Sequence, residues 1–348
     1  MPRVERSDAG GVRASIADVA RAAGVSTASV SRSLRGLGGV SEGTRARVVQ
    51  VARELGYAIS PGAASLRSGR TRSIAVVTPY IDRWFFGRAL GAFESVLQQA
   101  DLHVMLHSLH GSAEARRRLF AERILHRRVD AVLIMCLKLE QHEIDALEAL
   151  DVPVALLGSR AGDFSSVAID DFAAAHDAVS HLTGLGHRRI GLIGGSPADP
   201  LRFTAPMERR AGYRDALKSA GVANDRELEA DADYTIGGGE RAMTRLLALE
   251  RRPTAVFAES DEMAFGALRA LREARVKVPD DLSIIGIDDH DMSHLVDLTT
   301  VAQPVAEQGA AAAHALLAAL EDRSRPPSRL TEPTRLVVRG TTTTPQDA

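Results

Sequence analysis

The chain has 348 residues, 45% apolar and 25% charged, which is ordinary composition for a soluble globular protein and enough for two or three compact units. Residues 13–72 contain ten arginines and three acidic residues, which gives a net charge of +7, whereas residues 73–348 have a net charge of −9. The small basic segment therefore suits contact with phosphate backbones. Cys136 is the single cysteine, which rules out an internal disulfide. The sequence has no signal-peptide core and no apolar run close to the roughly 20 residues that are needed to span a bilayer. We therefore expect a cytoplasmic protein.

Residues 15–34, SIADVARAAGVSTASVSRSL, predict two short helices joined by a turn. Ser15 and Asp18 have the spacing of a capping box, Gly24 supplies a left-handed stop, and Ser26 caps the second helix. The outer face of that second helix is left with Thr27, Ala28, Ser29 and Arg32. Small and hydrogen-bonding residues with one guanidinium, near a helix N-terminus, suit entry into the major groove, where arginine can bind guanine through two hydrogen bonds. The alternative is an ordinary amphipathic helical hairpin with a solvated face.

A third helix is predicted to begin after Ser41 and to end at Gly56 and Tyr57. Residues 60–71 are predicted to contain a helix of about two turns, in which Pro61 can occupy the first turn. Because isolated helices below about 12 residues rarely persist in water, we expect this one to form only against DNA or a second copy of the chain.

From residue 73 onward, apolar strand-like runs alternate with amphipathic helical stretches. The runs lie at 74–77, 104–107, 131–135, 154–157, 190–194, 254–258, 282–287 and 336–339, and an alanine-rich helix is expected near 305–320. This alternation predicts an α/β body with two doubly wound parallel sheets, helices on both faces and a ligand at the carboxyl ends of the strands in the cleft between the sheets. The threonine run at 341–344 is expected to fray.

Many motifs occur together in one order along the chain. They are IADVARAAGVSTASVSRSL, LGY and AASL near the N-terminus, followed by RRVDAVLI, HLTGLGHRRIGLIGG, RRAGYRDAL, ESDEMAFGAL, LSIIGIDD, LTTVAQP and LVVRGTT. With these motifs the chain resembles the lactose/galactose repressor (LacI/GalR) family of bacterial transcription factors along nearly its full length.

The resemblance implies a domain organisation. It places a disordered tail at 1–13, a helix-turn-helix DNA-binding domain at 14–59, a hinge helix and linker at 60–71, an effector-binding and dimerisation domain at 72–340, and a tail at 341–348. The large domain would resemble periplasmic binding proteins and have two lobes. The N-lobe would comprise about 72–171 and 303–331, and the C-lobe about 172–302 and 332–340.

For DNA binding, the resemblance puts the base-reading positions on Thr27 and Ala28 and a shared arginine on Arg32. The other positions that it assigns to DNA contacts or caps are Ser15, Ser26, Ser29, Ser31, Arg35, Tyr57, Ala63 and Leu66. Leu66 would wedge into the minor groove at the operator centre and kink the duplex, and the alternative for it is a packing role. Arg35 and Ala64 depart from the family's usual asparagine and arginine, so phosphate contacts there would differ.

For effector binding, the resemblance puts the ligand-binding arginine on Arg209 and the aspartate that holds ligand hydroxyls on Asp288. Both side chains can make paired, charge-assisted hydrogen bonds to vicinal hydroxyls. Candidates for the aromatic face that covers a sugar ring are Trp84, Phe85 and Phe86, with a packing role as the alternative. The remaining cleft or hinge positions are Asp170, Ser260 and Gln303. Ser260 replaces the family's usual asparagine, so the effector itself cannot be carried over.

Other classes of function fit less well. The run from Asp288 to Asp291 invites a metal site, but no second histidine cluster at metal spacing supports one, and we expect no metal. GLIGGS at 191–196 lacks the spacing of a dinucleotide fingerprint, and neither a phosphate loop nor GxSxG occurs, so we expect no enzyme. A ligand-binding transport receptor would need an export signal and would leave the basic segment unexplained.

We therefore predict a cytoplasmic, homodimeric regulator of transcription, most simply a repressor, that binds double-stranded operator DNA without a cofactor or a membrane partner. Its effector would be a small molecule, a sugar by preference, with a nucleobase or another metabolite as the alternative. Binding between the lobes would change their angle and so form or melt the linker helices. The same mechanism serves an inducer or a corepressor.

Overall fold

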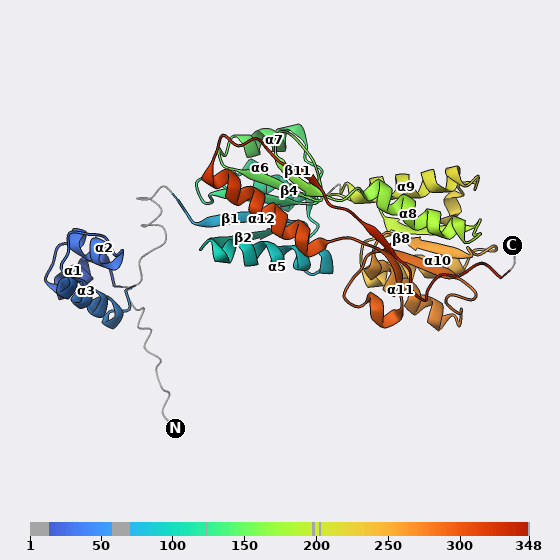
Figure 1. Cartoon of the computed structure of the whole chain (residues 1–348), viewed down its shortest axis with the longest axis horizontal. Helices are drawn as coiled ribbons and strands as arrows, with labels where there is room; N and C mark the ends of the chain where they lie inside the picture. The colour runs from blue at the N-terminus through green and yellow to red at the C-terminus, as the bar shows by residue number, and fades with distance from the viewer. Residues whose placement is uncertain (1–13, 58–69, 123, 197–198, 202, 347–348) are drawn as a thin grey trace, which may run out of the picture. The chain divides into compact units, whose positions relative to one another are not determined.

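The computed structural model describes residues 14–57, 70–122, 124–196, 199–201 and 203–346. The predictions for the tail at 1–13 and for Ala63 and Leu66 in the linker lie outside these residues. Backbone contacts divide the chain into two compact units, residues 1–71 and residues 72–348 (Figure 1). Within the described residues, no helix is long and apolar enough to cross a membrane.

In the part of the first unit that the structure describes, residues 14–57 and 70–71, there are three helices, and this unit is called the head below. They are α1 (Ile16–Ala23), α2 (Thr27–Leu34) and α3 (Glu42–Glu54). The capping box of Ser15 and Asp18 is present at the start of α1, and Gly24 ends that helix in the left-handed conformation with a φ of 64°. The core is six small or β-branched residues, Val19, Ala20, Ala23, Val30, Val48 and Ala52. Both caps and the three predicted helices are confirmed.

The N-lobe of the second unit has a six-stranded parallel sheet in the order β11-β5-β4-β3-β1-β2. Its strands are β1 (Ser73–Thr78), β2 (His103–Ser108), β3 (Ala131–Met135), β4 (Val154–Leu157), β5 (Ser165–Ala168) and β11 (Arg329–Thr331). Its helices are α5 (Trp84–Gln99), α6 (Ala113–Ala121), α7 (Gln141–Glu148) and α12 (Val305–Glu321). Helix α5 packs beside α12, and α6 packs beside α7.

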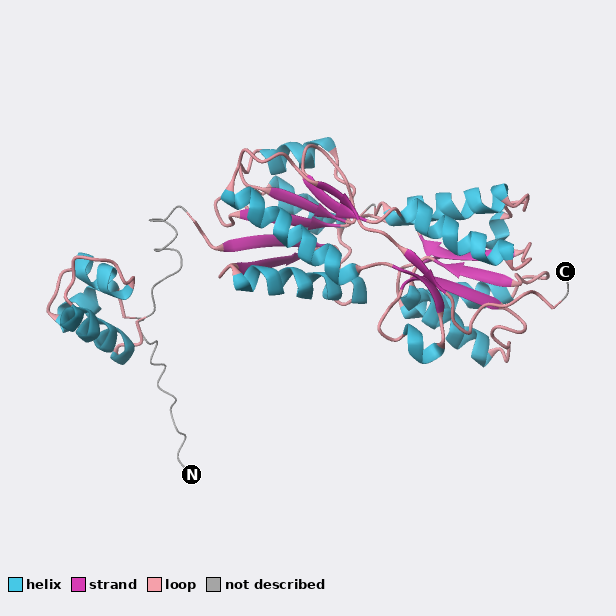
Figure 2. Cartoon of the chain, viewed as in Figure 1, coloured by secondary structure: helices cyan, strands magenta, loops and turns pink. Residues whose placement is uncertain are grey.

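The C-lobe has a second six-stranded sheet, in the order β12-β10-β9-β8-β6-β7. Its strands are β6 (Ile190–Gly195), β7 (Glu229–Ala232), β8 (Ala255–Ala258), β9 (Ser283–Asp288), β10 (Thr299–Ala302) and β12 (Arg335–Val337). Its helices are α8 (Asp171–Gly184), α9 (Ala205–Ser219), α10 (Ile236–Leu247) and α11 (Asp261–Glu273), with short 3-10 turns at Arg226–Leu228 and Ser293–Val296. Figure 2 shows helices on both faces of each sheet. The predicted doubly wound α/β body is confirmed, except that β12 pairs antiparallel with β10.

Most of the strands that periodicity predicted are buried on both faces, whereas the predicted β2 and β12 are partly exposed. Every residue of β3, AVLIM, is buried, as expected of a strand that helices cover on each side. The sequence pattern missed β5, β7, β10 and β11, whose sequences SSVA, EADA, TTVA and RLT are short and partly polar. Such segments have no apolar run to mark them, so only pairing with a neighbouring strand defines them.

The C-terminal threonines are ordered against the C-lobe sheet, so the expectation that residues 341–344 fray is wrong. Thr341 is buried, and its hydroxyl accepts a hydrogen bond from the Thr299 N–H (2.8 Å) and donates to the Ile284 carbonyl (2.8 Å). The ring of the buried His187 contacts Ser283 and the carbonyl of Thr343. These contacts satisfy polar groups at the N-terminal end of β9 that the sheet itself leaves open.

Candidate functional site

The N-terminal half of α2 presents small and polar side chains to solvent. Thr27, Ala28 and Arg32 are exposed, whereas Val30 is buried in the head core. Ser26 caps the helix by accepting a hydrogen bond from the Ser29 N–H at 3.1 Å. The outward face is therefore the predicted one, on a helix whose first turn is fixed by its own cap.

The arginines of the head divide between structural and exposed ones. Arg45 donates to the carbonyls of Leu37 (2.7 Å) and Ser33 (3.4 Å), and so holds the loop that follows α2. Arg32, Arg35, Arg47 and Arg53 are exposed. The capped N-terminus of α2 and the exposed guanidiniums of the head are both suited to binding the phosphates of an anionic polymer.

Several residues predicted to contact DNA have structural roles in the head. The Ser15 hydroxyl and the Ser15 N–H both donate to the Asp18 carboxylate, at 2.6 and 2.9 Å. Ser31 is half-buried, and Tyr57 packs against the head core. Arg35 is the C-terminal cap residue of α2 and is exposed. A contact between any of these residues and DNA remains a prediction.

A cavity lies between the two lobes of the body. Its lining comes from residues that follow parallel strands of both sheets, including Cys136 after β3, Ser260 after β8 and Gln303 after β10. The aromatic side chains around it are Phe85, Phe86, Phe203 and Tyr234. The cavity is therefore at the carboxyl ends of the strands, where the crossings between lobes leave room for a ligand.

Arg209 forms a charged wall of this cavity. It lies on α9, is 6% exposed, and donates from Nε to Asp171 Oδ1 (2.7 Å) and from Nη1 to the carbonyl of Glu259. Burial disfavours the charged guanidinium, but the neighbouring carboxylates, Asp171 foremost, outweigh it and raise the pKa of Arg209. The guanidinium is thus charged, neutralised by one aspartate and fixed in orientation.

Asp288 ends β9 and contributes a buried carboxyl group. Its Oδ1 accepts from Gln303 Nε2 at 2.6 Å, and Gln303 in turn accepts from Gln308 at 2.9 Å. Burial raises the pKa of Asp288 in spite of Arg209, which favours the protonated carboxyl group, a form that can donate a hydrogen bond as well as accept one. Its φ of 135° is a backbone conformation that L-residues rarely adopt.

The start of α11 adds Ser260 to the cavity and Asp261 behind it. Ser260 caps α11 by accepting from the Met263 N–H at 3.3 Å. Asp261 is fully buried and accepts from the His290 N–H (2.9 Å) and the Ser293 hydroxyl (2.6 Å). Asp261 therefore fixes the loop after β9, the strand that carries Asp288.

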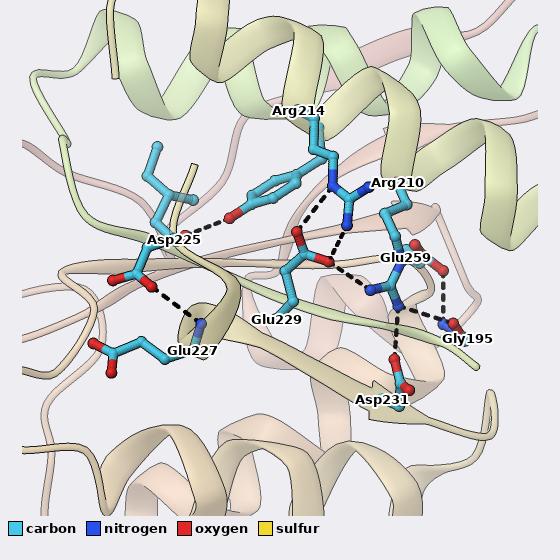
Figure 3. A network of polar contacts seen from close by, with 10 residues as sticks. Gly195, Arg210, Arg214, Asp225, Glu227, Glu229, Asp231 and Glu259 are labelled. Atoms are coloured by element: carbon cyan, nitrogen blue, oxygen red, sulfur yellow. Dashed lines mark hydrogen bonds and ion pairs between the residues drawn. The ribbon is translucent and has the colours of Figure 1, made fainter. Parts of the chain in front are cut away.

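Arg210, the residue after Arg209 on α9, belongs to a polar network that includes Gly195, Glu229, Asp231 and Glu259 (Figure 3). Glu259 accepts from the Gly195 N–H (2.8 Å) and the Tyr234 hydroxyl (2.7 Å), and burial raises its pKa to about 7. Arg210 donates to Glu229 (2.6 Å), to Asp231 and to the Gly195 carbonyl, so β6 and β7 are tied to α9. Arg209 is thereby held on a helix that is anchored along its length.

The chain resembles known proteins over nearly all of its residues. Residues 15–60 match the model for bacterial regulatory proteins of the lacI family, and residues 179–342 match a periplasmic binding protein-like domain. The HTH-type transcriptional repressor CytR of Escherichia coli (strain K12) is 34% identical over 334 residues, which cover 94% of this chain and 96% of CytR. The chain belongs to the LacI family.

Solved structures agree with this assignment to the LacI family. The lac repressor dimer bound to operator and the anti-inducer ONPF is 27% identical, with a TM-score of 0.81 over 95% of this chain and all of that one. A complex of the transcriptional regulator CelR with cellobiose is 31% identical, with a TM-score of 0.70 over 94% of this chain and all of CelR.

In this LacI-family chain, six of the predicted effector residues surround the cavity. They are Phe85, Phe86, Arg209, Ser260, Asp288 and Gln303. The expectation that Trp84 and Asp170 line it is not met. The Trp84 indole is turned to the Asp291 carboxylate (3.0 Å), and the exposed Asp170 caps α8 by accepting from the Ala173 N–H (2.9 Å).

Sequence reasoning missed other residues of the cavity wall. Asp171 is one position from the predicted Asp170, and a helix start with two successive aspartates gives no sign of which one turns inward. Phe203 and Tyr234 lie outside the strands and helices, where no periodicity indicates their direction. Cys136 lies directly after β3 instead of within it, and burial raises the pKa of its thiol to about 12, so it packs as an unreactive side chain. Among the described residues, no group of three or more metal-binding side chains occurs.

Proposed function

We propose that this protein is a cytoplasmic repressor of transcription that binds operator DNA as a homodimer through α2. The observation that carries the proposal is the exposure of Thr27, Ala28 and Arg32 on a capped, positively charged helix of a LacI-family head. Arg32 would bind guanine in the major groove, while the two small residues allow the helix end to approach the base edges. The lac repressor dimer bound to operator is a precedent for the dimer and for the DNA.

We infer that the cavity binds an uncharged ring compound that controls operator binding. Arg209 is already neutralised by Asp171, so a charged ligand would leave an uncompensated charge in a buried site. Arg209, Asp288 and Ser260 offer donors and acceptors on one side, and Phe85 with Phe86 offers an apolar face. That combination suits a sugar, and the cellobiose complex of CelR is a precedent.

A nucleobase or nucleoside is the second candidate. The four aromatic side chains around the cavity favour it, since a planar heterocycle can stack on them and use the same polar groups through its edge. Sugars and nucleobases differ in hydroxyl content, so a comparison of their affinities for the cavity measures directly which class it prefers.

The linker would carry the signal from the cavity to the head. We propose that residues 60–71 form paired helices on the operator, with Leu66 and Ala63 at the minor groove, and that a change in lobe angle melts them. Leu66→Ala is then expected to weaken operator binding without changing the affinity of the cavity for its ligand, as measured by titration calorimetry. Equal operator affinity in Leu66→Ala and the wild type would refute this role.

A thermal-shift screen of the purified protein tests the proposed cavity. The panel contains cellobiose, ribose, glucose, adenine, uracil and cytidine, and a ligand at 100 times its Kd raises the free energy of unfolding by about 2.7 kcal/mol. Each stabilising compound is then added to the protein on an operator obtained by unbiased selection from random DNA. We expect one compound to stabilise the protein and to change its operator affinity. Failure to select any DNA site, with and without the panel, would overturn the proposal.

A further inference from the structure

Trp84, the only tryptophan of the chain, connects the two lobes of the body. It begins α5 in the N-lobe, yet its Nε1–H donates to Asp291 Oδ2 of the C-lobe at 3.0 Å. The indole ring also lies against the His290 ring, with 4.7 Å between the centroids and 34° between the planes. The tryptophan thus makes a polar and an apolar contact with the loop that follows β9.

The backbone of Trp84 makes a second contact with the C-lobe. Arg83, at the N-cap of α5, provides no side-chain cap for the helix. The carboxyl group of Glu262, in the first turn of α11, lies near the Trp84 N–H, and this interaction offsets part of the rise that burial causes in the pKa of Glu262. Since the N-terminus of a helix favours a negative charge, a residue of the C-lobe is placed where it can stabilise the first turn of an N-lobe helix.

The C-lobe side of this contact is itself held in place. Phe265 of α11 packs edge-on against the His290 ring at 5.1 Å, and His290 Nδ1 accepts from the Met292 N–H at 2.9 Å. The His290 N–H donates to Asp261, so the loop is fixed to α11. Trp84 is therefore connected through His290 to α11, whose N-cap residue is Ser260, and to the loop that follows Asp288.

We propose that Trp84 is a positioning residue for the effector cavity, which with Asp291 and Glu262 forms a clasp between the lobes. The proposal rests on the proposed function of that cavity. Trp84 does not line the cavity, whereas its neighbours Phe85 and Phe86 do. The clasp therefore sets the distance between the phenylalanines of the N-lobe and Asp288 of the C-lobe, and a ligand that needs both lobes binds only the clasped arrangement.

The first test needs no effector and uses the uniformly ¹⁵N-labelled full-length protein. The single indole N–H gives one signal, whose hydrogen exchange reports the hydrogen bond to Asp291. We expect Asp291→Ala to speed this exchange about tenfold or more, and Asp291→Asn, which keeps an oxygen acceptor, to stay within about threefold of wild type. Asp297→Asn removes a carboxylate from the same loop as a charge control and is expected to leave the exchange unchanged. Equal exchange in Asp291→Ala and wild type would show that no clasp forms in solution.

The second test measures affinity for whichever compound of the thermal-shift panel stabilises the wild type. Trp84→Phe and Asp291→Ala are expected to weaken binding about three- to thirtyfold, because only the clasped fraction of molecules binds, while Asp291→Asn stays near wild type. Unchanged affinity in both variants would refute the positioning role. If no compound binds the wild type, the proposed effector function fails, and the exchange measurement alone decides whether the lobes are clasped.

Discussion

The head and the body of this protein use arginine in opposite ways. In the head, Arg32 and Arg47 are exposed and the core is six small apolar residues. In the body, two guanidiniums are buried in ion pairs, Arg116 with Glu143 and Arg209 with Asp171. Substitution of an exposed head arginine should therefore change binding to an external anion, whereas substitution of either buried body arginine should change stability or the shape of the cavity.

The largest effect is expected at Arg116, which joins α6 to a segment of the C-lobe. Its side chain is 7% exposed and donates to Glu143 (2.6 and 2.7 Å) and to the carbonyl of Leu201 (2.5 Å). Removal of one partner of a buried pair leaves the other charge uncompensated, so Arg116→Ala should lower the free energy of unfolding by about 3–5 kcal/mol. Urea unfolding of the body, followed through Trp84 fluorescence, measures this change.

The adjacent Arg117 supplies the control for that experiment. Arg117 also has a glutamate partner, Glu114, but its side chain is 68% exposed. Arg117→Ala should change the free energy of unfolding by less than about 1 kcal/mol. Similar losses in the two variants would contradict the distinction between buried and exposed arginine pairs.

Glu259 in the body and Asp18 in the head should contribute to the pH dependence of stability with opposite signs. In the body, the pKa of Glu259 is raised from 4.5 to about 7, so the native state binds the extra proton and stability falls as pH rises between those values, by at most about 3 kcal/mol. In the head, hydrogen bonds from Ser15 and Arg21 lower the pKa of Asp18, so stability falls as pH drops toward that lowered pKa.

Glu259→Gln isolates the contribution of the body, because glutamine cannot titrate. Unfolding of wild type and variant at pH 5, 6, 7 and 8 should show that the stability of the variant relative to wild type increases from pH 5 to pH 7 and is level above it. A constant difference across this range would show that Glu259 does not titrate with a raised pKa. Asp18→Asn, followed by helical circular dichroism, should remove the loss on acidification in the head.

Arg209→Lys should damage the cavity with a smaller loss of stability than a deletion. Lysine keeps a positive charge for Asp171 but lacks the planar fork that also reaches the Glu259 carbonyl and the cavity. We expect effector affinity to fall about 10- to 100-fold, as for loss of a charge-assisted hydrogen bond. Titration calorimetry with the stabilising compound measures this affinity. An affinity equal to that of wild type would show that Arg209 does not contribute to effector binding.

The smallest effect on stability is expected at Arg32, where only DNA binding should change. Arg32→Ala is expected to weaken operator binding by about 1–3 kcal/mol and to relax discrimination at one base pair, with stability within about 0.5 kcal/mol of wild type. Arg45→Ala is the matched substitution of a structural arginine and should destabilise the head. Retained discrimination between operator and random DNA in Arg32→Ala would refute base reading by this residue.

The head could be predicted almost residue by residue because its signals are local. Ser15 and Asp18 cap a helix from three residues apart, and Gly24 ends it through its own backbone freedom. The cavity could be predicted only in part, since its residues come from distant segments. Trp84 and Phe85 are adjacent in sequence, yet the indole contacts Asp291, 207 residues away, and the phenyl ring lines the cavity. No local pattern carries that information.

Control of the DNA affinity of the head by the cavity can be tested directly in one titration. Fluorescence anisotropy measures the Kd of wild type and Arg209→Lys for the selected operator, each with and without the stabilising compound. We predict that the compound changes the Kd of wild type for the operator about fivefold or more. In the absence of the compound, Arg209→Lys should bind the operator with the Kd of wild type. Addition of the compound should leave the Kd of Arg209→Lys unchanged. An undiminished response in Arg209→Lys, or no response in wild type, would contradict the account.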